Sequence, residues 1–385
     1  MTTTIISGVQ YSGIWNLNSQ IGAKAAATWP NANLFGALFT WGANGSGQLG
    51  NGNTTDYSSP KQVGTLTSWL TVSAGIYSSA VIKTDGTLWT WGKGTYGTLG
   101  HGNTTDYSSP KQLGALTNWL KLANKYQHCS AIKTDGTIWS WGQGANGKLG
   151  LGDTTNRSSP VQIGALTTWS AVDVGYWHTL AVKTDGTLWS WGWNVYGFLG
   201  LGNTTGYSSP KQVGALYTWL TVACGRYFSL ASKTDGTLWS WGQNNSGQLG
   251  IGNTTYYSSP KQVGSLTNWY SFRSGLNSTC SIKTDGTLWS WGANSLGELG
   301  LSDTTQRNSP VQVGSQSDWY IIACAHSNAL AIKNNRTLWT WGRNQSGQLG
   351  NSTTTYSSSP NQVGALSGWS AISGGRAFSL TVRAI

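Results

Sequence analysis

Hydrophobic and polar residues alternate over short stretches of this chain, and closely similar stretches return every 50 residues. In residues 80–91 (AVIKTDGTLWTW), Trp89 and Trp91 point to one side of a strand and the residue between them to the other. Asp85 and Gly86 separate two such halves, and this dipeptide favours a tight turn because glycine tolerates a positive φ. The stretch therefore predicts a β-hairpin.

Three sequence marks recur with this period and define the number of units. Trp-Gly begins at Trp41, Trp91, Trp141, Trp191, Trp241, Trp291 and Trp341. Ser-Pro ends at Pro60, Pro110, Pro160, Pro210, Pro260, Pro310 and Pro360, and a lone tryptophan stands at Trp69, Trp119, Trp169, Trp219, Trp269, Trp319 and Trp369. Proline lacks a backbone N–H, so it is expected only in an edge strand or a connection. Seven units of three or four short strands predict seven propeller blades.

The two ends of the chain together complete one unit. Residues 374–385 (GGRAFSLTVRAI) match the first half of a unit and stop before the hairpin turn. Residues 34–41 (LFGALFTW) match the second half, with Gly36 in the turn position. A blade shared by the two ends leaves no open strand edge, whereas a linear solenoid needs polar caps. We therefore predict an all-β fold, a closed seven-bladed β-propeller over residues 33–385.

Residues 1–32 lie outside the repeat and are predicted to form a short N-terminal arm. Residues 18–27 are compatible with a short helix, and Leu17 and Ile21 share one of its faces. Leu17, Ile21 and Trp29 are the candidate docking residues of the arm. Packing on the same propeller and insertion into a neighbouring subunit both remain open.

Composition supports a structural role for tryptophan and argues against a nucleic-acid partner. Most of the 24 tryptophans occupy repeated positions, and burial of one removes roughly 150–250 Å² from water. The formal net charge of +11 permits an anionic partner, but no run of five Lys or Arg is present. Arginine is concentrated in the second half of the chain, at Arg226, Arg273, Arg307, Arg336, Arg343, Arg376 and Arg383. This distribution suggests that one side of the propeller is rich in arginine and docks an acidic protein.

The titratable residues give no catalytic pattern. Cys129, Cys224, Cys280 and Cys324 form no C-x-x-C pair and are interpreted as small buried residues. The aspartates of the hairpin turns repeat identically, whereas an acid–base pair needs two carboxyls in different environments. His128 and His178 share a repeat position, which favours a structural pair on neighbouring blades. We expect no enzyme activity, no cofactor and no metal, and the absence of a long apolar run predicts no membrane insertion.

The loops that follow each Trp-Gly differ from unit to unit, and four of their aromatic residues are candidate binding residues. These are Tyr96, Trp193, Tyr196 and Phe198. A rigid scaffold with varied loops is a common basis of recognition, and exposed aromatic rings suit a sugar or a protein. Packing between neighbouring loops is the alternative explanation.

Two stretches resemble the repeat of the regulator of chromosome condensation family. They are residues 175–200 (GYWHTLAVKTDGTLWSWGWNVYGFLG) and 234–250 (TDGTLWSWGQNNSGQLG), which carry the G-x-x-H-[ST], D-G, W-G and N-x-x-G-Q-L-G elements of that repeat. The resemblance covers residues 33–385 and implies a seven-bladed propeller used for binding. The double-glycine signature of kelch propellers is absent.

Members of this family differ in function, so we compared the chain with several of them. The founding member exchanges nucleotide on a small GTPase and docks on chromatin, but no blade here carries an inserted loop. A plant ultraviolet-B photoreceptor uses a G-W-R-H-[ST] motif, and the nearest match is Gly175 to Thr179 (GYWHT). Phrases such as GNTTDYSSPKQVG resemble repeat proteins of bacteriophages.

These observations predict a non-enzymatic structural or interaction protein, a bacteriophage virion component of the capsid surface or tail with a possible role in host attachment. Its expected location is the virion, and its expected partners are other virion subunits and a glycan or host-surface receptor. The alternative is a signalling or guanine-nucleotide-exchange-like propeller that binds a small GTPase or chromatin.

Overall fold

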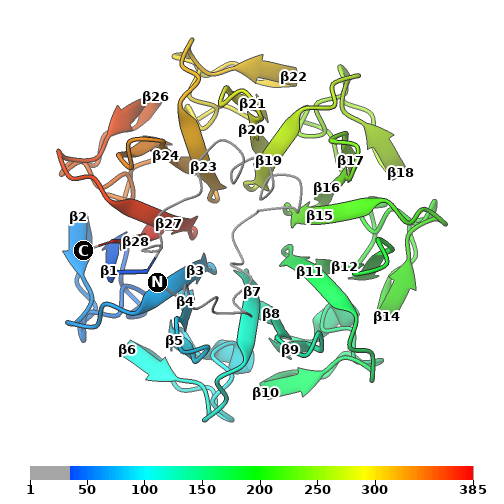
Figure 1. The fold of residues 1–385 in the computed structure, drawn as a ribbon, viewed down its shortest axis with the longest axis horizontal. Helices are drawn as coiled ribbons and strands as arrows, with labels where there is room; N and C mark the ends of the chain where they lie inside the picture. Colours follow the sequence, from blue (N-terminus) through cyan, green and yellow to red (C-terminus); the bar gives the residue numbers. More distant parts are fainter. Residues whose placement is uncertain (1–34, 385) are drawn as a thin grey trace, which may run out of the picture.

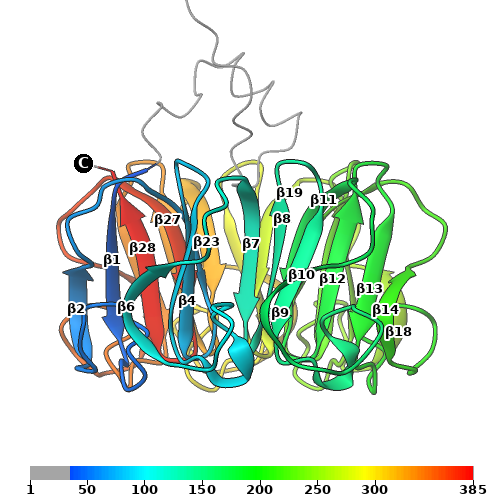
Figure 2. The ribbon, with the colours of Figure 1, turned by 90° about the horizontal axis from the view of Figure 1, so that it is seen from below.

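The computed structural model describes residues 35–384 and arranges them as a ring of seven four-stranded antiparallel sheets (Figure 1). Figure 2 shows that all of the sheets span the same two faces of the ring. This is the predicted closed seven-bladed β-propeller, with four strands in every blade. The predicted arm, with Leu17, Ile21 and Trp29, lies outside the described residues.

Four strand positions, A to D from the centre outward, recur in every blade (Figure 1). The A strands are β3 (Trp69–Ala74), β7 (Trp119–Lys125), β11 (Trp169–Val174), β15 (Trp219–Cys224), β19 (Trp269–Ser274), β23 (Trp319–Cys324) and β27 (Trp369–Gly374). The B strands are β4 (Ser78–Lys83), β8 (His128–Lys133), β12 (His178–Lys183), β16 (Phe228–Lys233), β20 (Ser278–Lys283), β24 (Asn328–Lys333) and β28 (Phe378–Arg383).

The C and D strands form the outer half of each blade. The C strands are β1 (Ala37–Gly42), β5 (Leu88–Gly92), β9 (Ile138–Gly142), β13 (Leu188–Gly192), β17 (Leu238–Gly242), β21 (Leu288–Gly292) and β25 (Leu338–Gly342). The D strands are β2 (Tyr57–Gln62), β6 (Tyr107–Gln112), β10 (Arg157–Gln162), β14 (Tyr207–Gln212), β18 (Tyr257–Gln262), β22 (Arg307–Gln312) and β26 (Ser357–Gln362). Two C–D loops contain the short 3-10 turns η1 (Thr95–Gly97) and η2 (Ala145–Gly147).

Because successive strands run in opposite directions, each face of the ring carries one set of connections. We call the face with the A–B turns and C–D loops the turn face. The face with the B–C hairpins and D–A connections is the hairpin face. Figure 2 shows the two sets of connections at opposite ends of the blades.

The B–C hairpin turns confirm the prediction made from Asp-Gly. Gly86 has a φ of 75°, which favours glycine. Asp85 Oδ1 accepts hydrogen bonds from the backbone N (2.9 Å) and Oγ1 (2.6 Å) of Thr87. Thr87 Oγ1 in turn accepts one from Trp89 Nε1 at 2.9 Å. The Asp-Gly-Thr sequence thus fixes both the turn and the orientation of the following tryptophan.

Proline occupies the predicted edge position. In the D strand β2, Tyr57 pairs with Gly42 and Lys61 pairs with Thr40, and the ladder is irregular between these pairs. Pro60 lies in this irregular stretch, where its missing N–H interrupts no ladder bond.

The shared blade closes the ring. Strands β27 and β28 from one end of the sequence join β1 and β2 from the other end in one sheet, in the order β2-β1-β28-β27. Leu38 pairs with Val382 and Trp41 pairs with Ser379 in an unbroken register. This confirms the prediction that residues 34–41 complete the unit begun by residues 374–385.

The hydrophobic core lies between adjacent blades. One cluster combines Leu230 and Leu238 of the β15–β18 blade with Trp269, Phe272 and Trp291 of the β19–β22 blade. Because a single sheet leaves both of its faces uncovered, each blade depends on its two neighbours for burial.

The C-strand tryptophans also bond across every blade interface. Trp91 Nε1 donates to the carbonyl oxygen of Gln48 in the preceding blade at 2.9 Å, and Ser79 Oγ donates to the same oxygen at 2.7 Å. The equivalent indole bonds measure 2.8 to 3.1 Å; their donors are Trp41, Trp141, Trp191, Trp241, Trp291 and Trp341. These buried hydrogen bonds hold adjacent blades together and fix the angle between them.

One hairpin departs from the repeat. The blade of β23–β26 has Arg336 where Gly86 stands, and Arg336 keeps a positive φ of 63°. The facing connection carries Gly368, which has a φ of 92°, and Trp369 N donates to Arg336 O at 3.2 Å. The non-glycine hairpin therefore coincides with an altered backbone in the connection opposite to it.

We expect Gly136→Ala to destabilise the protein more than Gly114→Ala. Both glycines have a positive φ, 77° and 60°, which costs a side chain about 1 kcal/mol. A Cβ at Gly136 would lie 2.1 Å from Thr167 O, whereas nothing lies within 4 Å of one at Gly114. This clash adds about 1 to 3 kcal/mol, measurable by urea unfolding. Equal costs for the two variants would contradict the expectation.

Among the described residues, no helix is long and apolar enough to cross a lipid bilayer.

Candidate functional site

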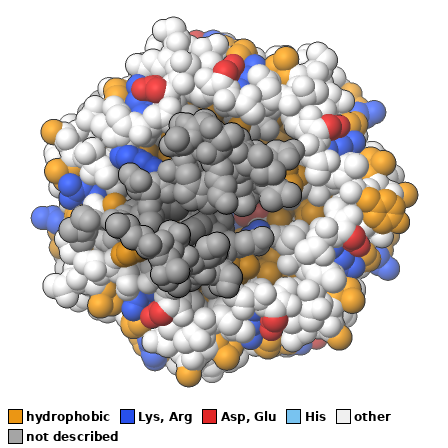
Figure 3. All heavy atoms as spheres, in the orientation of Figure 1, with side chains coloured by type: hydrophobic (Ala, Val, Ile, Leu, Met, Phe, Trp, Pro, Cys, Tyr) orange, Lys and Arg blue, Asp and Glu red, His pale blue; other side chains and the backbone are white. Residues whose placement is uncertain are grey.

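The hairpin face is formed by side chains that repeat from blade to blade. Lys83 Nζ lies 5.3 Å from the ring centroid of Trp89 and 3.6 Å from Asp85 Oδ2. The same lysine lies over the same tryptophan in further blades, at Lys133, Lys183, Lys233, Lys283 and Lys333. Figure 3 looks onto this face and shows basic and acidic groups side by side around the ring. Repetition in six of the seven blades is what a packing role predicts; the shared blade has Arg383 and Phe39 at these positions.

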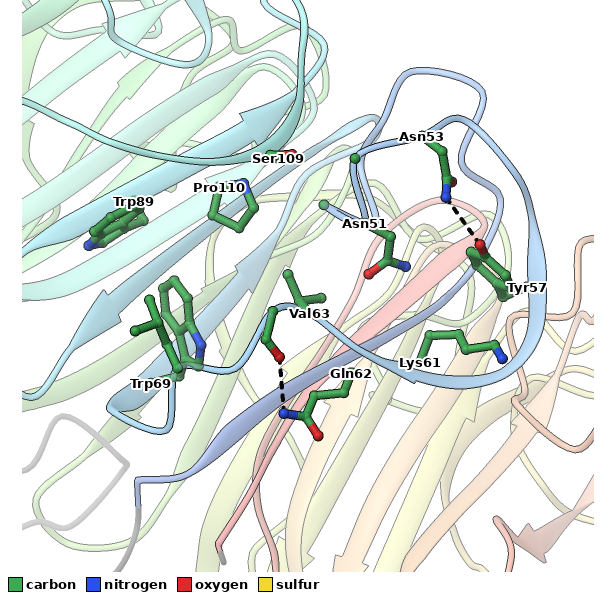
Figure 4. Close-up of a pocket in the computed structure, with 14 residues that line it drawn as sticks. Asn51, Asn53, Tyr57, Lys61, Gln62, Val63, Trp69, Trp89, Ser109 and Pro110 are labelled. Atoms are coloured by element: carbon green, nitrogen blue, oxygen red, sulfur yellow. Dashed lines mark hydrogen bonds between the residues drawn. The ribbon is translucent and has the colours of Figure 1, made fainter.

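An open pocket of about 530 Å³ lies between the shared blade and the β3–β6 blade (Figure 4). Its lining includes Asn51, Gln62, Trp69, Trp89 and Pro110. A second pocket of about 340 Å³ has the equivalent residues Leu151, Gln162, Trp169, Trp189 and Pro210. Since equivalent residues line both pockets, we interpret them as grooves that the repeat forms between adjacent blades.

The centre of the turn face, in contrast, differs in every blade. The tips of the A–B turns are Ile76-Tyr77, Tyr126-Gln127, Tyr176-Trp177, Arg226-Tyr227, Leu276-Asn277, His326-Ser327 and Arg376-Ala377. The blades have the same strand order, so residues required only for packing would repeat with them. The variation at these tips makes the turn face the candidate recognition surface.

Seven aromatic residues form a continuous series on this face, which we call the aromatic row. Its members, in order of contact, are Tyr176, Tyr126, Trp177, Trp193, Tyr227, Tyr196 and Tyr256. Tyr126 stacks on Tyr176 with ring centroids 4.8 Å apart, and Tyr196 meets Tyr256 at 5.6 Å. All but Tyr256 are half-buried. The row joins three blades, and its aromatic rings are partly exposed to solvent.

The structure gives different outcomes for the four predicted loop aromatics. Trp193 and Tyr196 belong to the aromatic row. Tyr96 is exposed in η1, where it has a φ of 62°. The prediction that Phe198 belongs to an exposed recognition loop is wrong, because its side chain is 0% exposed and packs 4.8 Å from the ring of His178. Its repeat position, that of Gln48, faces the blade interface.

A buried lysine lies beneath the aromatic row. Lys148 Nζ lies 5.2 Å from the ring centroid of Tyr126 and 5.0 Å from that of Trp177. It donates a hydrogen bond to Gln143 Oε1. No carboxylate pairs with this amine among the described ion pairs. Burial lowers the pKa of Lys148 to about 7, because the charged form loses its hydration.

We expect Lys148→Gln to raise stability near pH 7, by an amount that shrinks at higher pH. The folded-state pKa lies below that of the unfolded chain, so unfolding takes up a proton between about pH 7 and the ordinary lysine pKa. Stability from this group therefore rises with pH in that window, by at most about 1.4 kcal/mol per pH unit. Glutamine occupies the same repeat position at Gln48, Gln248 and Gln348. Urea unfolding at pH 7 and pH 10 measures the difference; a constant difference would contradict the expectation.

Side chains from non-adjacent blades meet at the ring centre. Lys125 of β7 donates to Ser274 Oγ in β19 at 3.2 Å, and its Nζ lies 3.7 Å from Asp173 Oδ2 in β11. On the turn face, the ring centroids of Tyr176 and His326 are 6.4 Å apart, although they belong to the third and sixth A–B turns in sequence. The centre of this face is therefore covered by side chains of several blades.

The histidines and cysteines have structural environments. His128 and His178 lie on neighbouring blades, as predicted. His128 Nε2 lies 3.2 Å from Thr179 Oγ1, and His178 Nε2 lies 2.9 Å from Ser229 Oγ, each on the next blade. Burial lowers the pKa of His178 to about 3. All four cysteines are buried and unpaired, which confirms their interpretation. Within residues 35–384, no three His, Cys, Asp or Glu side chains are grouped as metal ligands.

The A–B turns are a part of the candidate site that the sequence pattern did not predict. The loops after Trp-Gly predicted Trp193 and Tyr196, whereas Tyr176, Trp177 and Tyr227 lie in A–B turns. The signal was available, because the repeat positions of Ile76 and Tyr77 also vary in chemical type from unit to unit.

Comparison with known proteins agrees with this architecture. A family model described as RCC1-like domain matches residues 37–381. A search of curated proteins finds no match.

Several solved structures have the same fold. Human WBSCR16 superposes with a TM-score of 0.81 and 19% identity, over 91% of this chain and 99% of that chain. Prp20p from Saccharomyces cerevisiae gives a TM-score of 0.82 and 18% identity, over 92% and 93%. Yeast RCC1 (Prp20) bound to Kap60 gives a TM-score of 0.81 and 18% identity, over 100% and 97%. At such identities the likeness concerns the fold alone.

Proposed function

The chain belongs to the RCC1-like domain family, and from that premise we propose that it is a non-catalytic propeller whose turn face binds a partner protein. The supporting observation is the aromatic row. Its residues do not repeat, although the blades that carry them do.

The chemistry of the aromatic row suits a protein surface. Tyrosine, tryptophan and arginine are enriched in the energetically important part of protein–protein interfaces, since they combine large apolar area with polar groups. Here half-buried Trp177 and Trp193 lie in ring contact at 5.6 Å, and Arg226 lies 4.8 Å from the ring centroid of Tyr227. Half-buried rings are held in place by their neighbours, so that binding orders few additional side chains.

The structural relatives support a protein as the partner. One title describes the binding of Prp20p to Gsp1p and histones, and another describes yeast RCC1 bound to Kap60. They favour a signalling or exchange-factor-like propeller over a phage structural protein. Location in a bacteriophage virion, attachment to a host and a glycan receptor stay predictions that have not been tested directly.

A photo-crosslinking experiment tests the proposed face. Benzoylphenylalanine replaces Tyr196 in the aromatic row or, as a control, Tyr217, which is 67% exposed in a D–A connection of the hairpin face. After irradiation in the native cells, we expect mass spectrometry to find a discrete protein adduct from position 196 and none from position 217. Adducts only from position 217, or from neither position, would reject the turn face as the site.

The exchange-factor alternative has a separate readout. Purified protein is mixed with a small GTPase loaded with a fluorescent guanine nucleotide. Accelerated nucleotide release, lost when Trp177 and Trp193 are replaced by alanine, would support exchange. Nucleotide release at the spontaneous rate would reject exchange activity and retain only the proposal that the turn face binds a protein.

A further inference from the structure

Four basic side chains converge beside the aromatic row at the centre of the turn face, and we call them the cationic cluster. They are Lys93, Arg226, Arg343 and Arg376. Arg226 and Arg376 are tips of A–B turns, and the remaining two begin the loops that follow C strands. Three of the seven arginines in the second half of the chain belong to the cluster. The prediction that these arginines lie on one side does not hold for all of them, because Arg336 lies in a B–C hairpin and Arg383 ends a B strand, both at the hairpin face.

Contacts between the A–B turns of neighbouring blades place these residues together. Arg376 Nη1 donates to the hydroxyl of Tyr77 at 2.6 Å, and Lys93 Nζ lies 5.5 Å from the ring centroid of the same tyrosine. Backbone bonds link successive turns, from Arg226 N to Leu276 O (3.3 Å) and from Leu276 N to His326 O (3.1 Å).

His326 lies among the three arginines of the cluster. Burial lowers the pKa of His326 to about 4, and the positive charges of Arg376, Arg343 and Arg226 act in the same direction. The neutral imidazole therefore adds no charge near pH 7. It leaves the guanidinium groups as the cations of this part of the face.

The cationic cluster lacks carboxylate partners. The five ion pairs among residues 35–384 involve other basic residues, namely Lys83, Lys125, Arg157, Arg307 and Lys333. Arg226 Nε is buried and has no hydrogen-bond partner within the described chain. Like charges held close together without a counter-charge repel one another, and a bound anion would relieve that repulsion.

We propose that the cationic cluster binds an acidic segment of the partner protein, whose carboxylates pair with Arg226 and Arg376 while its backbone lies against the aromatic row. This inference rests on the proposed function, because it names the chemistry of the partner at the same face. Guanidinium groups suit the task because they bind carboxylates through two parallel hydrogen bonds.

The distribution of acidic residues favours a peptide over a nucleic acid. Four carboxylates lie in the C–D loops further from the centre of the turn face, at Asp56, Asp106, Asp153 and Asp303, and the carboxylate at the ring centre, that of Asp173, is paired with Lys125. Asp153 and Asp303 pair with Arg157 and Arg307 at 2.6 and 2.5 Å. A nucleic acid across the face would meet these carboxylates with its phosphates, whereas a short acidic segment would contact only the centre.

Binding of a labelled acidic peptide to the full chain tests this inference. The probe is a fluorescein-labelled peptide of ten glutamates, followed by fluorescence anisotropy, with a ten-residue polyglutamine peptide for comparison. We expect the polyglutamate peptide to bind, to weaken as salt increases, and to lose about tenfold or more in affinity in the double variant Arg226→Leu, Arg376→Leu. Leucine is native at the equivalent Leu276, so the backbone accepts it.

The matched control is the double variant Arg157→Gln, Arg307→Gln. It removes the same two charges from the rim of the same face and should change affinity by less than about twofold. Equal losses in both double variants, or no binding of polyglutamate, would overturn the inference. Stronger competition by ten-nucleotide oligothymidylate than by unlabelled polyglutamate would also overturn it and indicate a nucleic acid instead. If the leucine variant has a lowered melting temperature, Arg226→Gln, Arg376→Gln replaces it.

The two proposals fail in distinguishable ways. An adduct from position 196 without polyglutamate binding would retain a partner on the turn face and reject an acidic partner segment. Polyglutamate binding without an adduct would retain the anion site and reject a protein partner on this face in the native cells.

Discussion

Replacing Trp291 by alanine is expected to lower the free energy of unfolding by about 3 to 5 kcal/mol. The indole is fully buried and packs in the cluster that joins the β15–β18 and β19–β22 blades. Its ring centroid lies 5.7 Å from that of Trp269, and its Nε1 donates to Gln248 O at 3.0 Å. Alanine would leave a cavity that the neighbouring β-sheets can fill only by shifting. Urea unfolding followed by tryptophan fluorescence measures the loss.

Two further variants separate the sources of this effect. Trp291→Phe keeps an aromatic ring, and Thr279 Oγ1 still donates to Gln248 O at 3.0 Å, so we expect a smaller loss of about 1 to 2 kcal/mol. Leu266→Ala, at a side chain 43% exposed, should change stability by less than about 0.5 kcal/mol. Equal losses for Trp291→Ala and Leu266→Ala would contradict the assignment of the core to the blade interfaces.

A chain that ends at Gly374 is expected not to form the closed ring. The missing strand β28 pairs with β27 on one side and with β1 on the other. It also contributes buried Phe378, Leu380 and Val382 to the core. Losing three buried side chains and two ladders exceeds the 5 to 15 kcal/mol by which a typical domain is stable. Circular dichroism during heating should show no cooperative transition.

A circular permutant provides the control for chain length and end position. It begins at Gly114, continues from Ile385 into Met1 and ends at Leu113, so that every strand is kept and the new ends lie in a D–A connection. We expect this permutant to unfold cooperatively. Cooperative unfolding of the shortened chain, with a transition close to that of the full chain, would show that the shared blade is not required for closure.

The sequence by itself determined the architecture. Strand alternation, the Asp-Gly turn and the position of proline all act over a few residues, so they can be recognised locally and counted along the chain. The constant spacing of Trp-Gly then predicted seven blades, and residues 34–41 predicted the shared one. These predictions are confirmed, because a repeat that satisfies local geometry once satisfies it in every blade.

Only the tertiary structure decided which side chains form the candidate site. Phe198 and Tyr196 are two residues apart in one loop, yet one is buried in a blade interface and the other is accessible on the turn face. Arg376 and Tyr77 are 299 residues apart and bond at 2.6 Å because the ring closes. The repeat determines how each blade folds. Which side chains meet at the centre of the ring depends on the angle between the blades. That angle is set by the packing and the buried hydrogen bonds of all seven interfaces together.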